Sequence, residues 1–281
     1  MERRGPTRIR ALVLGGGGVT GIAWEIGVLA GLAASGVDLT RADTVIGTSA
    51  GAFVGAAVAS GHDLRALAEA QAVPDPQEIS VAASQETIAA WFNAFGAGDA
   101  TSVGAAFGRI ANENPEPVPV HVRRAIVESR LVTTRWPDSL KVTAVDADSG
   151  VLQMFDHDSG IELVDAVAAS GAVPGVWPLA RINGRSWIDG GMVSSANASL
   201  ADGHERIIVL APMPAGFGTI PGVEEDVAAL QEQATVVLFS PDEQSTLAIG
   251  PNPYDPSRRG PAAEAGESQG LRMAPIVEEM W

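Results

Sequence analysis

Apolar residues near the start of the chain alternate between short strand-like runs and longer segments with helical spacing. Residues 8–14 form an aliphatic run that predicts a buried strand, and residues 19–34 carry Ile22, Ile26 and Leu29 three or four positions apart. A second β-branched run begins at residue 44 and leads into an alanine-rich segment. This order of strand, helix, strand and helix predicts an α/β fold with a mostly parallel sheet covered by helices.

The remaining sequence shows no internal repeat and no clear linker, so we expect a single domain over residues 1–281. Its core motifs lie within residues 9–211, and a helical, Pro-rich tail covers residues 241–281. We predict strands at residues 141–146, 151–155, 206–210 and 235–239, helices at residues 64–72, 85–95, 120–129, 161–169, 223–233 and 258–271, and a separate final segment at residues 275–281.

An aromatic stripe marks the predicted helix over residues 85–95. Trp91, Phe92 and Phe95 would share one side of that helix. Packing in the core is the simpler interpretation. The alternative is a lid or the wall of a tunnel for an acyl chain, with a hinge at residues 96–98.

The composition is typical of a well-packed globular chain and restricts its partners. Hydrophobic residues make up 46% and charged residues 19% of the 281 residues. The formal net charge of −16 argues against nucleic acid, and it weakens electrostatic docking on anionic membranes. Peripheral contact with a membrane through apolar side chains stays open. The chain has no cysteine, which excludes disulfides and thiolate chemistry.

The first residues do not predict an export signal. Arg3 and Arg4 are basic, but the apolar run over residues 11–14 is too short for a signal peptide and leads into four glycines. The least polar window, residues 44–60, is shorter than a membrane span. We therefore expect a cytoplasmic protein with no transmembrane segment. The sequence indicates no oligomeric state.

A Gly-x-Ser-x-Gly motif follows the second predicted strand. Ser49 lies between Gly47 and Gly51, at the point where the strand gives way to a helix. This is the context of a nucleophile elbow, in which a strained turn exposes the serine hydroxyl. A Cβ at either glycine would clash where strand and helix approach. The N-terminus of the following helix favours negative charge near Ser49.

The glycine run after the first strand has three interpretations. Gly16, Gly18 and Gly21 fit a dinucleotide-binding fingerprint, but the acidic residue expected at the end of the second strand is missing. A phosphate-binding Walker loop fails because no Gly-Lys-Ser/Thr follows. The third is an oxyanion hole, formed by backbone N–H groups that face the serine. We favour the oxyanion hole because the elbow follows directly, although a simple tight turn would produce the same pattern.

A serine nucleophile needs a base, and the chain offers histidines and one well-placed acid. His62, His121, His157 and His204 are the histidines. His157, which follows a strand, is the strongest candidate among them, but such residues commonly lie in surface turns. Asp189 opens an Asp-Gly-Gly turn, whose glycines Gly190 and Gly191 would allow close approach to the elbow. A buried carboxylate can share a proton with a serine.

Together these motifs resemble the patatin-like phospholipase family. The glycine-rich loop at residues 14–21, the Gly-x-Ser-x-Gly motif at residues 47–51 and Asp-Gly-Gly at residues 189–191 occur in the order typical of that family. The block from Ala169 to Trp177 and Trp187-Ile188 before Asp189 also match. The resemblance covers residues 9–211, and residues 250–270 are similar to the tail of bacterial members.

The resemblance implies a three-layer α/β/α fold and a lipid acyl hydrolase acting on carboxylic ester bonds, as a phospholipase A, lysophospholipase or esterase. Ser49 would be the nucleophile and Asp189 its base. The oxyanion hole would come from the glycine loop, with N–H groups of Gly16, Gly17 and Gly18, and from Ala50. No metal and no cofactor are implied.

The sequence departs from the family pattern at two places. Thr20 stands where the family usually has Arg or Lys, which favours less acidic lipids or simple esters as substrates. Residues 194–197 stand where Asn-x-Pro is more usual. Two alternative functions also stay open: an acyltransferase that uses Ser49 as the acyl carrier, and a non-catalytic lipid-binding protein with the same fold.

Overall fold

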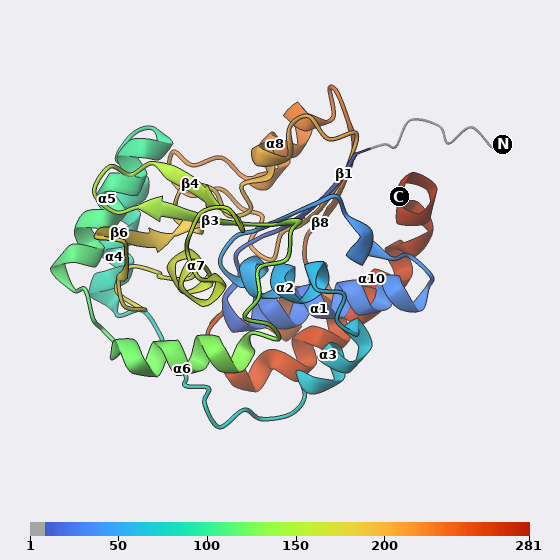
Figure 1. The fold of residues 1–281 in the computed structure, drawn as a ribbon, viewed down its shortest axis with the longest axis horizontal. Helices are drawn as coiled ribbons and strands as arrows, with labels where there is room; N and C mark the ends of the chain where they lie inside the picture. Colours follow the sequence, from blue (N-terminus) through green and yellow to red (C-terminus); the bar gives the residue numbers. More distant parts are fainter. Residues whose placement is uncertain (1–8) are drawn as a thin grey trace.

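The computed structural model of the protein describes residues 9–281, so the predicted strand residue Arg8 lies outside the described residues. An eight-stranded mixed sheet forms the centre, with helices on both of its faces (Figure 1). The strands are β1 (Arg10–Leu14), β2 (Thr44–Gly47), β3 (Leu140–Asp146), β4 (Leu152–Phe155), β5 (Ala180–Ile182), β6 (Arg185–Asp189), β7 (Arg206–Leu210) and β8 (Thr235–Phe239). This architecture confirms the predicted α/β class and its three layers.

Ten helices surround this sheet within residues 9–281. They are α1 (Gly18–Ala34), α2 (Ala50–Ala59), α3 (Leu64–Ala70), α4 (Gln85–Phe95), α5 (Ala100–Glu113), α6 (Val120–Arg130), α7 (Leu163–Ser170), α8 (Val223–Leu230), α9 (Glu243–Ile249) and α10 (Arg259–Met280). Short 3-10 helices add Leu39–Arg41, Gly190–Met192, Ala198–Ala201 and Pro256–Arg258.

The sheet order is β5-β6-β3-β2-β1-β7-β8, and β4 pairs with β3. The pairs that join β3, β2, β1, β7 and β8 are parallel, as the sequence predicts. The pairs that β4, β5 and β6 make are antiparallel. The carboxyl ends of parallel strands share one edge of a sheet, so the loops after β1 and β2 emerge side by side.

Successive side chains along each strand point to opposite faces of the sheet, so the hydrophobic core has a part on each face. Leu12 and Leu14 pack with α1, α2 and α10, which lie below the sheet in Figure 1. Ala11 and Val13 point the other way, toward α8 above the sheet. Strands buried on both faces explain why the sequence shows continuous apolar runs instead of strict alternation.

Several segments differ from the sequence-based prediction. Strands β5 and β6 and helices α5 and α9 were not predicted. The predicted helix 258–271 and the separate segment 275–281 form one continuous helix, α10, with Pro275 inside it. The helix continues past the proline because its far end is anchored in the core, with Val277 0% and Met280 7% exposed.

Candidate functional site

Ser49 lies on a sharp turn between β2 and α2. Its φ of 53° and ψ of −111° fall in a backbone region that residues other than glycine rarely adopt. A Cβ at Gly51 would lie 2.1 Å from the carbonyl oxygen of Leu14, and one at Gly47 would lie 2.6 Å from the carbonyl oxygen of Gly51. Only glycine lets strand and helix approach this closely, and the turn has the geometry of the predicted nucleophile elbow.

The strand register brings Asp189 to the same place. Gly47 at the end of β2 pairs with Val142 of β3, and Asp189 at the end of β6 pairs with Ala144. Because β2 runs parallel to β3 and β6 runs antiparallel to it, the two strands approach Thr143 from opposite directions. The strand β2 ends on one side of Thr143 and β6 ends on the other. Two residues far apart in the sequence, Ser49 and Asp189, therefore line one cavity.

The carboxyl group of Asp189 is held out of water. Asp189 is 1% exposed, and the Gly191 N–H donates to its Oδ1 at 2.6 Å. Burial raises the pKa of Asp189 to about 6, while the Ser49 hydroxyl, the Gly191 N–H and the charge of Arg123 oppose that rise. The group is therefore ionised at neutral pH but more basic than an ordinary aspartate.

The glycine loop leads directly into α1 beside Ser49. The Gly16 N–H donates to the carbonyl oxygen of Ser195 at 2.7 Å. Gly17 and Gly18 line the same cavity as Ser49. Gly18 and Ala50 are the first residues of α1 and α2, so their N–H groups have no acceptor within their own helices. Two helix N-termini therefore converge near the Ser49 side chain.

The cavity beside Ser49 has a volume of about 190 Å³ and is mostly apolar. Its apolar side chains come from α4, α5 and the loops around β6 and β7: Trp91, Phe95, Phe107, Val173, Met192, Met213, Phe217 and Ile220. Of the predicted aromatic stripe, Trp91 and Phe95 line this cavity and also pack against the core, whereas Phe92 is 73% exposed. An apolar cavity wall next to a nucleophile suits an acyl chain.

Sequence reasoning missed a buried polar network beneath Ser49 and Asp189. The Asn197 side-chain amide donates to Thr48 Oγ1 at 3.0 Å and to the carbonyl oxygen of Gly190 at 3.2 Å. The hydroxyls of Thr48 and Thr143 lie 2.8 Å apart. Asn197 is 1% exposed, so it ties the residue before the nucleophile to the residue after Asp189. In the sequence, residues 194–197 stood out only as a departure from the family pattern.

Three further residues near Ser49 were also missed. Ser170, at the end of α7, accepts the Ser49 N–H at 2.8 Å and so helps to fix the turn. Tyr254 lines the cavity from the loop before α10. Arg123 of α6 is 5% exposed, and its charge lowers the pKa of Asp189. Ser170 and Tyr254 lie in segments that resemble the family, residues 169–177 and 250–270, but nothing local indicated that either reaches the site.

Thr20, the position where a basic residue is usual, supplies no charge to the site. It is fully buried in the first turn of α1. Its N–H donates to the carbonyl oxygen of Pro253 at 3.2 Å, and its hydroxyl donates to the same oxygen at 3.4 Å. Thr20 therefore helps to hold the loop before α10 against the glycine loop.

The histidines lie away from the cavity beside Ser49. His157 contacts its neighbour Asp158, whose side chain is 84% exposed. His121 is exposed on α6. His204 contacts the carbonyl oxygen of Ala201 and the Thr44 hydroxyl, at 2.9 and 3.0 Å. His62 lines a separate groove. No histidine within residues 9–281 borders the Ser49 cavity.

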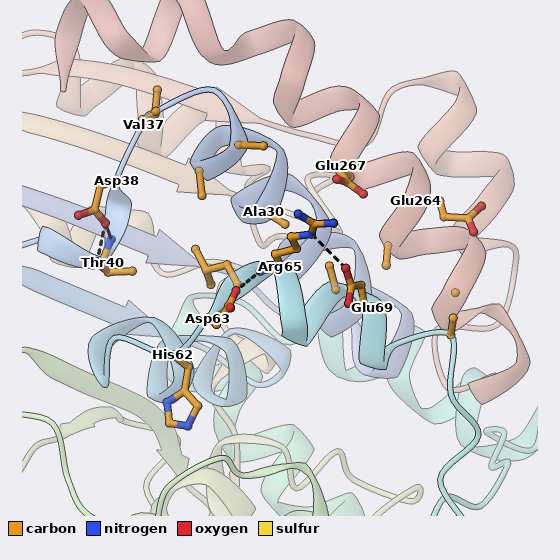
Figure 2. Close-up of a pocket in the computed structure, with 18 residues that line it drawn as sticks. Ala30, Val37, Asp38, Thr40, His62, Asp63, Arg65, Glu69, Glu264 and Glu267 are labelled. Atoms are coloured by element: carbon orange, nitrogen blue, oxygen red, sulfur yellow. Dashed lines mark hydrogen bonds and ion pairs between the residues drawn. The ribbon is translucent and has the colours of Figure 1, made fainter.

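That separate groove is larger, about 1080 Å³, and is lined by α1, α3 and α10. Figure 2 shows Glu264 and Glu267 of α10 near the ion pair between Arg65 and Glu69 of α3. The groove is acidic and open, and it contains neither Ser49 nor Asp189. We therefore assign the candidate active site to the smaller cavity, because Ser49 on its strained turn and the buried Asp189 line it together.

Two properties of the described chain bear on metals and membranes. Within residues 9–281, no group of three or more His, Cys, Asp or Glu side chains is arranged to hold a metal ion. Over the same range, no helix combines the length and the apolar character that crossing a bilayer requires.

Solved structures with similar folds include VipD from Legionella pneumophila, 13% identical with a TM-score of 0.47, over 96% of this chain and 67% of that chain. The type III effector protein ExoU is 17% identical with a TM-score of 0.41, over 96% of this chain and 54% of that chain. ExoU in its complex with SpcU, from Pseudomonas aeruginosa, is 19% identical with a TM-score of 0.36, over 94% of this chain and 52% of that chain. The chain spans about half the length of the ExoU chains.

The comparison with curated proteins found no match. The family model of the patatin-like phospholipases matches residues 12–202, which include the glycine loop, the elbow and the Asp-Gly-Gly turn. Family membership supports a lipid acyl hydrolase of the serine ester hydrolase type in general terms. Since the match covers well over half of the chain, the protein belongs to the patatin-like phospholipase family.

Proposed function

We propose that the protein is a metal-independent lipid acyl hydrolase in which Ser49 is the nucleophile and Asp189 is the base. One observation carries this proposal. A serine on a strained turn and a buried carboxyl group with a raised pKa line the same apolar cavity. A nucleophile, a base and a site for an acyl chain are the parts that ester hydrolysis through a covalent intermediate requires.

The acylation step follows from this arrangement. Ser49 Oγ attacks the ester carbonyl carbon, the electron pair of the C=O double bond moves to oxygen, and Asp189 takes the hydroxyl proton. The tetrahedral intermediate then collapses, the bond to the alcohol breaks, and Asp189 returns the proton to the leaving oxygen. In the second half, Asp189 accepts a proton from water as that water attacks the acyl-serine. The second tetrahedral intermediate collapses, the bond from the acyl carbon to Ser49 Oγ breaks, and Asp189 returns the proton to Ser49 as the fatty acid leaves.

The N–H groups of Gly17, Gly18 and Ala50 are the donors that we propose for the oxyanion. Gly18 and Ala50 begin helices, so their N–H groups and the positive helix ends are available to a negative oxygen. Gly16, which the sequence also suggested, donates its N–H to Ser195. In this arrangement Gly16 shapes the loop and does not contact the oxyanion.

The test compares wild type with Ser49→Ala and Asp189→Asn on short p-nitrophenyl esters, with EDTA present throughout. Both variants should lose several orders of magnitude in kcat, roughly 10³-fold or more, because the two groups act as a unit. Ser80→Ala and Asp158→Asn change exposed residues away from the cavity and serve as matched controls. Near-normal activity of Asp189→Asn in a folded protein would show that the base lies elsewhere.

Two further measurements separate this function from the alternatives. Labelling by a serine-directed fluorophosphonate should occur in wild type and disappear in Ser49→Ala, whereas a non-catalytic lipid-binding protein would not be labelled. Product analysis with an added alcohol or thiol should give mainly free fatty acid. A transferred ester or thioester as the main product would instead identify an acyltransferase.

A further inference from the structure

Arg123 is a buried cation whose hydrogen-bonding groups the fold does not satisfy. Its side chain reaches from α6 toward the elbow and is 5% exposed. Nη2 donates to the carbonyl oxygen of Gly171 at 3.3 Å, but Nε and Nη1 have no acceptor among the described residues. Burying a charge and leaving donors unpaired both cost stability. Structural support alone therefore does not explain an arginine at this position.

The charged groups around Arg123 do not form a direct ion pair with it within residues 9–281. Arg130, seven residues further along α6, already binds both oxygens of Glu78, at 2.7 and 2.5 Å. Asp189 and Tyr254 face Arg123 from β6 and from the loop before α10. The guanidinium lies over the ring of Trp177, 4.3 Å from its centroid, which fixes its position without neutralising it.

A small cavity of about 20 Å³ lies next to Arg123. Gly18, Ser49 and Ala50 also line it, and Gly18 and Ser49 are shared with the acyl cavity. That volume holds one water-sized group, hence one oxygen atom, and is too small for a phosphate. The N-termini of α1 and α2, at Gly18 and Ala50, add two positive helix ends to the positive guanidinium.

We propose that Arg123 binds and stabilises the negatively charged oxygen that forms when Ser49 attacks the substrate carbonyl. This inference rests on the proposed function and adds a catalytic residue to it. The oxygen would occupy the small cavity, held by the N–H groups of Gly18 and Ala50 and facing the unpaired guanidinium donors.

The movement of charge explains why this interaction would accelerate the reaction. Before attack, the negative charge belongs to Asp189, which borders the acyl cavity but not the small one. Attack forms the bond from Ser49 Oγ to carbon, moves the C=O electron pair to oxygen and transfers the proton to Asp189. The charge thereby moves to the side of Arg123. An interaction that is stronger in the transition state than in the ground state lowers the barrier.

The test replaces Arg123 by Met and by Lys and uses neutral p-nitrophenyl butyrate as the substrate. Measurements at about pH 7.5 lie above the pKa of Asp189 near 6 and below that of Arg123, which burial lowers to about 9, so both groups are charged in the wild type. For Arg123→Met we expect kcat to fall about 10- to 100-fold with KM changed less than about threefold. Arg123→Lys keeps a nitrogen donor at this position and should give an intermediate kcat. Arg124→Met, a neighbouring exposed arginine of α6, is the control.

Two readouts distinguish this function from a structural role. The melting temperature of Arg123→Met should equal or exceed that of wild type, because the change removes an unpaired buried charge. A trifluoromethyl ketone, which binds Ser49 as a charged hemiketal, should lose affinity in Arg123→Met roughly in parallel with kcat. If Arg123→Met does not fold, Arg123→Lys provides both readouts.

Several results would overturn the inference. One is a kcat of folded Arg123→Met within about twofold of wild type. Another is a loss confined to phospholipids with an unchanged rate on the neutral ester, which would mark a head-group site. Failure of the proposed function has a different outcome, since wild type would then be inactive on every ester or Ser49→Ala would be active.

Discussion

Asp189 is buried, yet its proposed role as the base requires its charged form. Burial raises its pKa to about 6, and only the ionised carboxylate can accept the proton of Ser49. We therefore predict that kcat/KM for a neutral ester increases with pH through an apparent pKa near 6 and is constant above it. The measurement is a rate profile from about pH 4.5 to about pH 8.5. A profile with no acid limb in this range would argue against Asp189 as the base.

The same pKa has the opposite effect on stability. Because the pKa of Asp189 is higher in the folded state, near 6, than in the unfolded chain, ionisation of Asp189 destabilises the folded state increasingly as the pH rises from about 4 to about 6, and by a constant amount above that. Below about pH 4 the group is protonated in both states and the penalty disappears. Asp189→Asn should therefore raise the free energy of unfolding by up to about 3 kcal/mol at pH 8 and by much less at pH 4.

Urea unfolding at the two pH values measures this difference directly. Asp158→Asn, at a side chain that is 84% exposed, is the matched control and should show no such dependence. Equal effects of Asp189→Asn at both pH values would mean that burial does not shift the pKa of Asp189. A gain in stability together with a loss of activity in Asp189→Asn would show that the carboxylate lowers the stability of the fold but is required for the reaction.

Gly51 tests how closely the elbow depends on backbone contact. A Cβ there would lie 2.1 Å from the carbonyl oxygen of Leu14, so β1 and α2 would have to separate. We predict that Gly51→Ala lowers the free energy of unfolding by about 2–4 kcal/mol, as other severe core clashes do. Gly96→Ala is the control, because its nearest atom would be 3.5 Å away. A loss for Gly51→Ala no greater than that of the control would contradict this prediction.

At the scale of elements, α10 packs against α1 through direct backbone contact. A Cβ at Gly27 of α1 would lie 2.1 Å from the carbonyl oxygen of Ala263, and one at Gly270 of α10 would lie 2.3 Å from that of Val28. Small residues on both helices therefore allow a close crossing. This contact, together with the buried end of α10, compensates for the hydrogen bond that Pro275 removes.

Replacing this proline should stabilise the protein. Pro275 is exposed, so alanine fits at this position and restores the N–H that bonds to the carbonyl oxygen four residues earlier. After allowance for the greater freedom of the unfolded chain, Pro275→Ala should add about 1–2 kcal/mol to the free energy of unfolding. Pro261→Ala, in the first turn of α10 where no such bond is lost, should give no gain. Equal free energies of unfolding for Pro275→Ala and Pro261→Ala, measured in urea, would contradict this prediction.

The catalytic motifs could be predicted from the sequence, whereas the buried residues that surround them could not. Strand, turn and glycine chemistry are local, and the sequence therefore predicted the elbow at Ser49 and the turn at Asp189. Arg123 and Asn197 lie on segments whose position depends on how α6 and β6 pack, and no spacing in the sequence encodes that packing. The continuous α10 was missed for the same reason, since the local rule for Pro275 is overruled by tertiary contacts.

At the scale of the whole molecule, net charge and exposed apolar groups determine how the protein could approach lipid. The formal net charge of −16 opposes binding to anionic membranes. Phe92, Met213 and Phe217, here called the apolar rim, are 73%, 39% and 37% exposed. Met213 and Phe217 line the acyl cavity, and Phe92 lies on α4 beside the cavity residue Trp91.

We therefore predict that the apolar rim, and not charge, carries the protein onto a lipid surface. Phe92→Ala and Phe217→Ala should lower hydrolysis of phospholipid vesicles several-fold, roughly 3- to 10-fold each, because each loses apolar area that membrane contact would bury. Hydrolysis of a short soluble ester by Phe92→Ala should be unchanged, since Phe92 does not line the cavity. Leu247→Ala, at a side chain 71% exposed on α9, is the matched control.

Salt provides an independent measurement of the same point. With vesicles that contain anionic lipid, added NaCl screens the repulsion from an acidic protein, so hydrolysis should increase or stay constant. A marked decrease would show that a local basic surface governs docking. If Leu247→Ala reduced vesicle hydrolysis as strongly as Phe92→Ala, the effect would follow from exposed apolar area in general, and the apolar rim would have no special role.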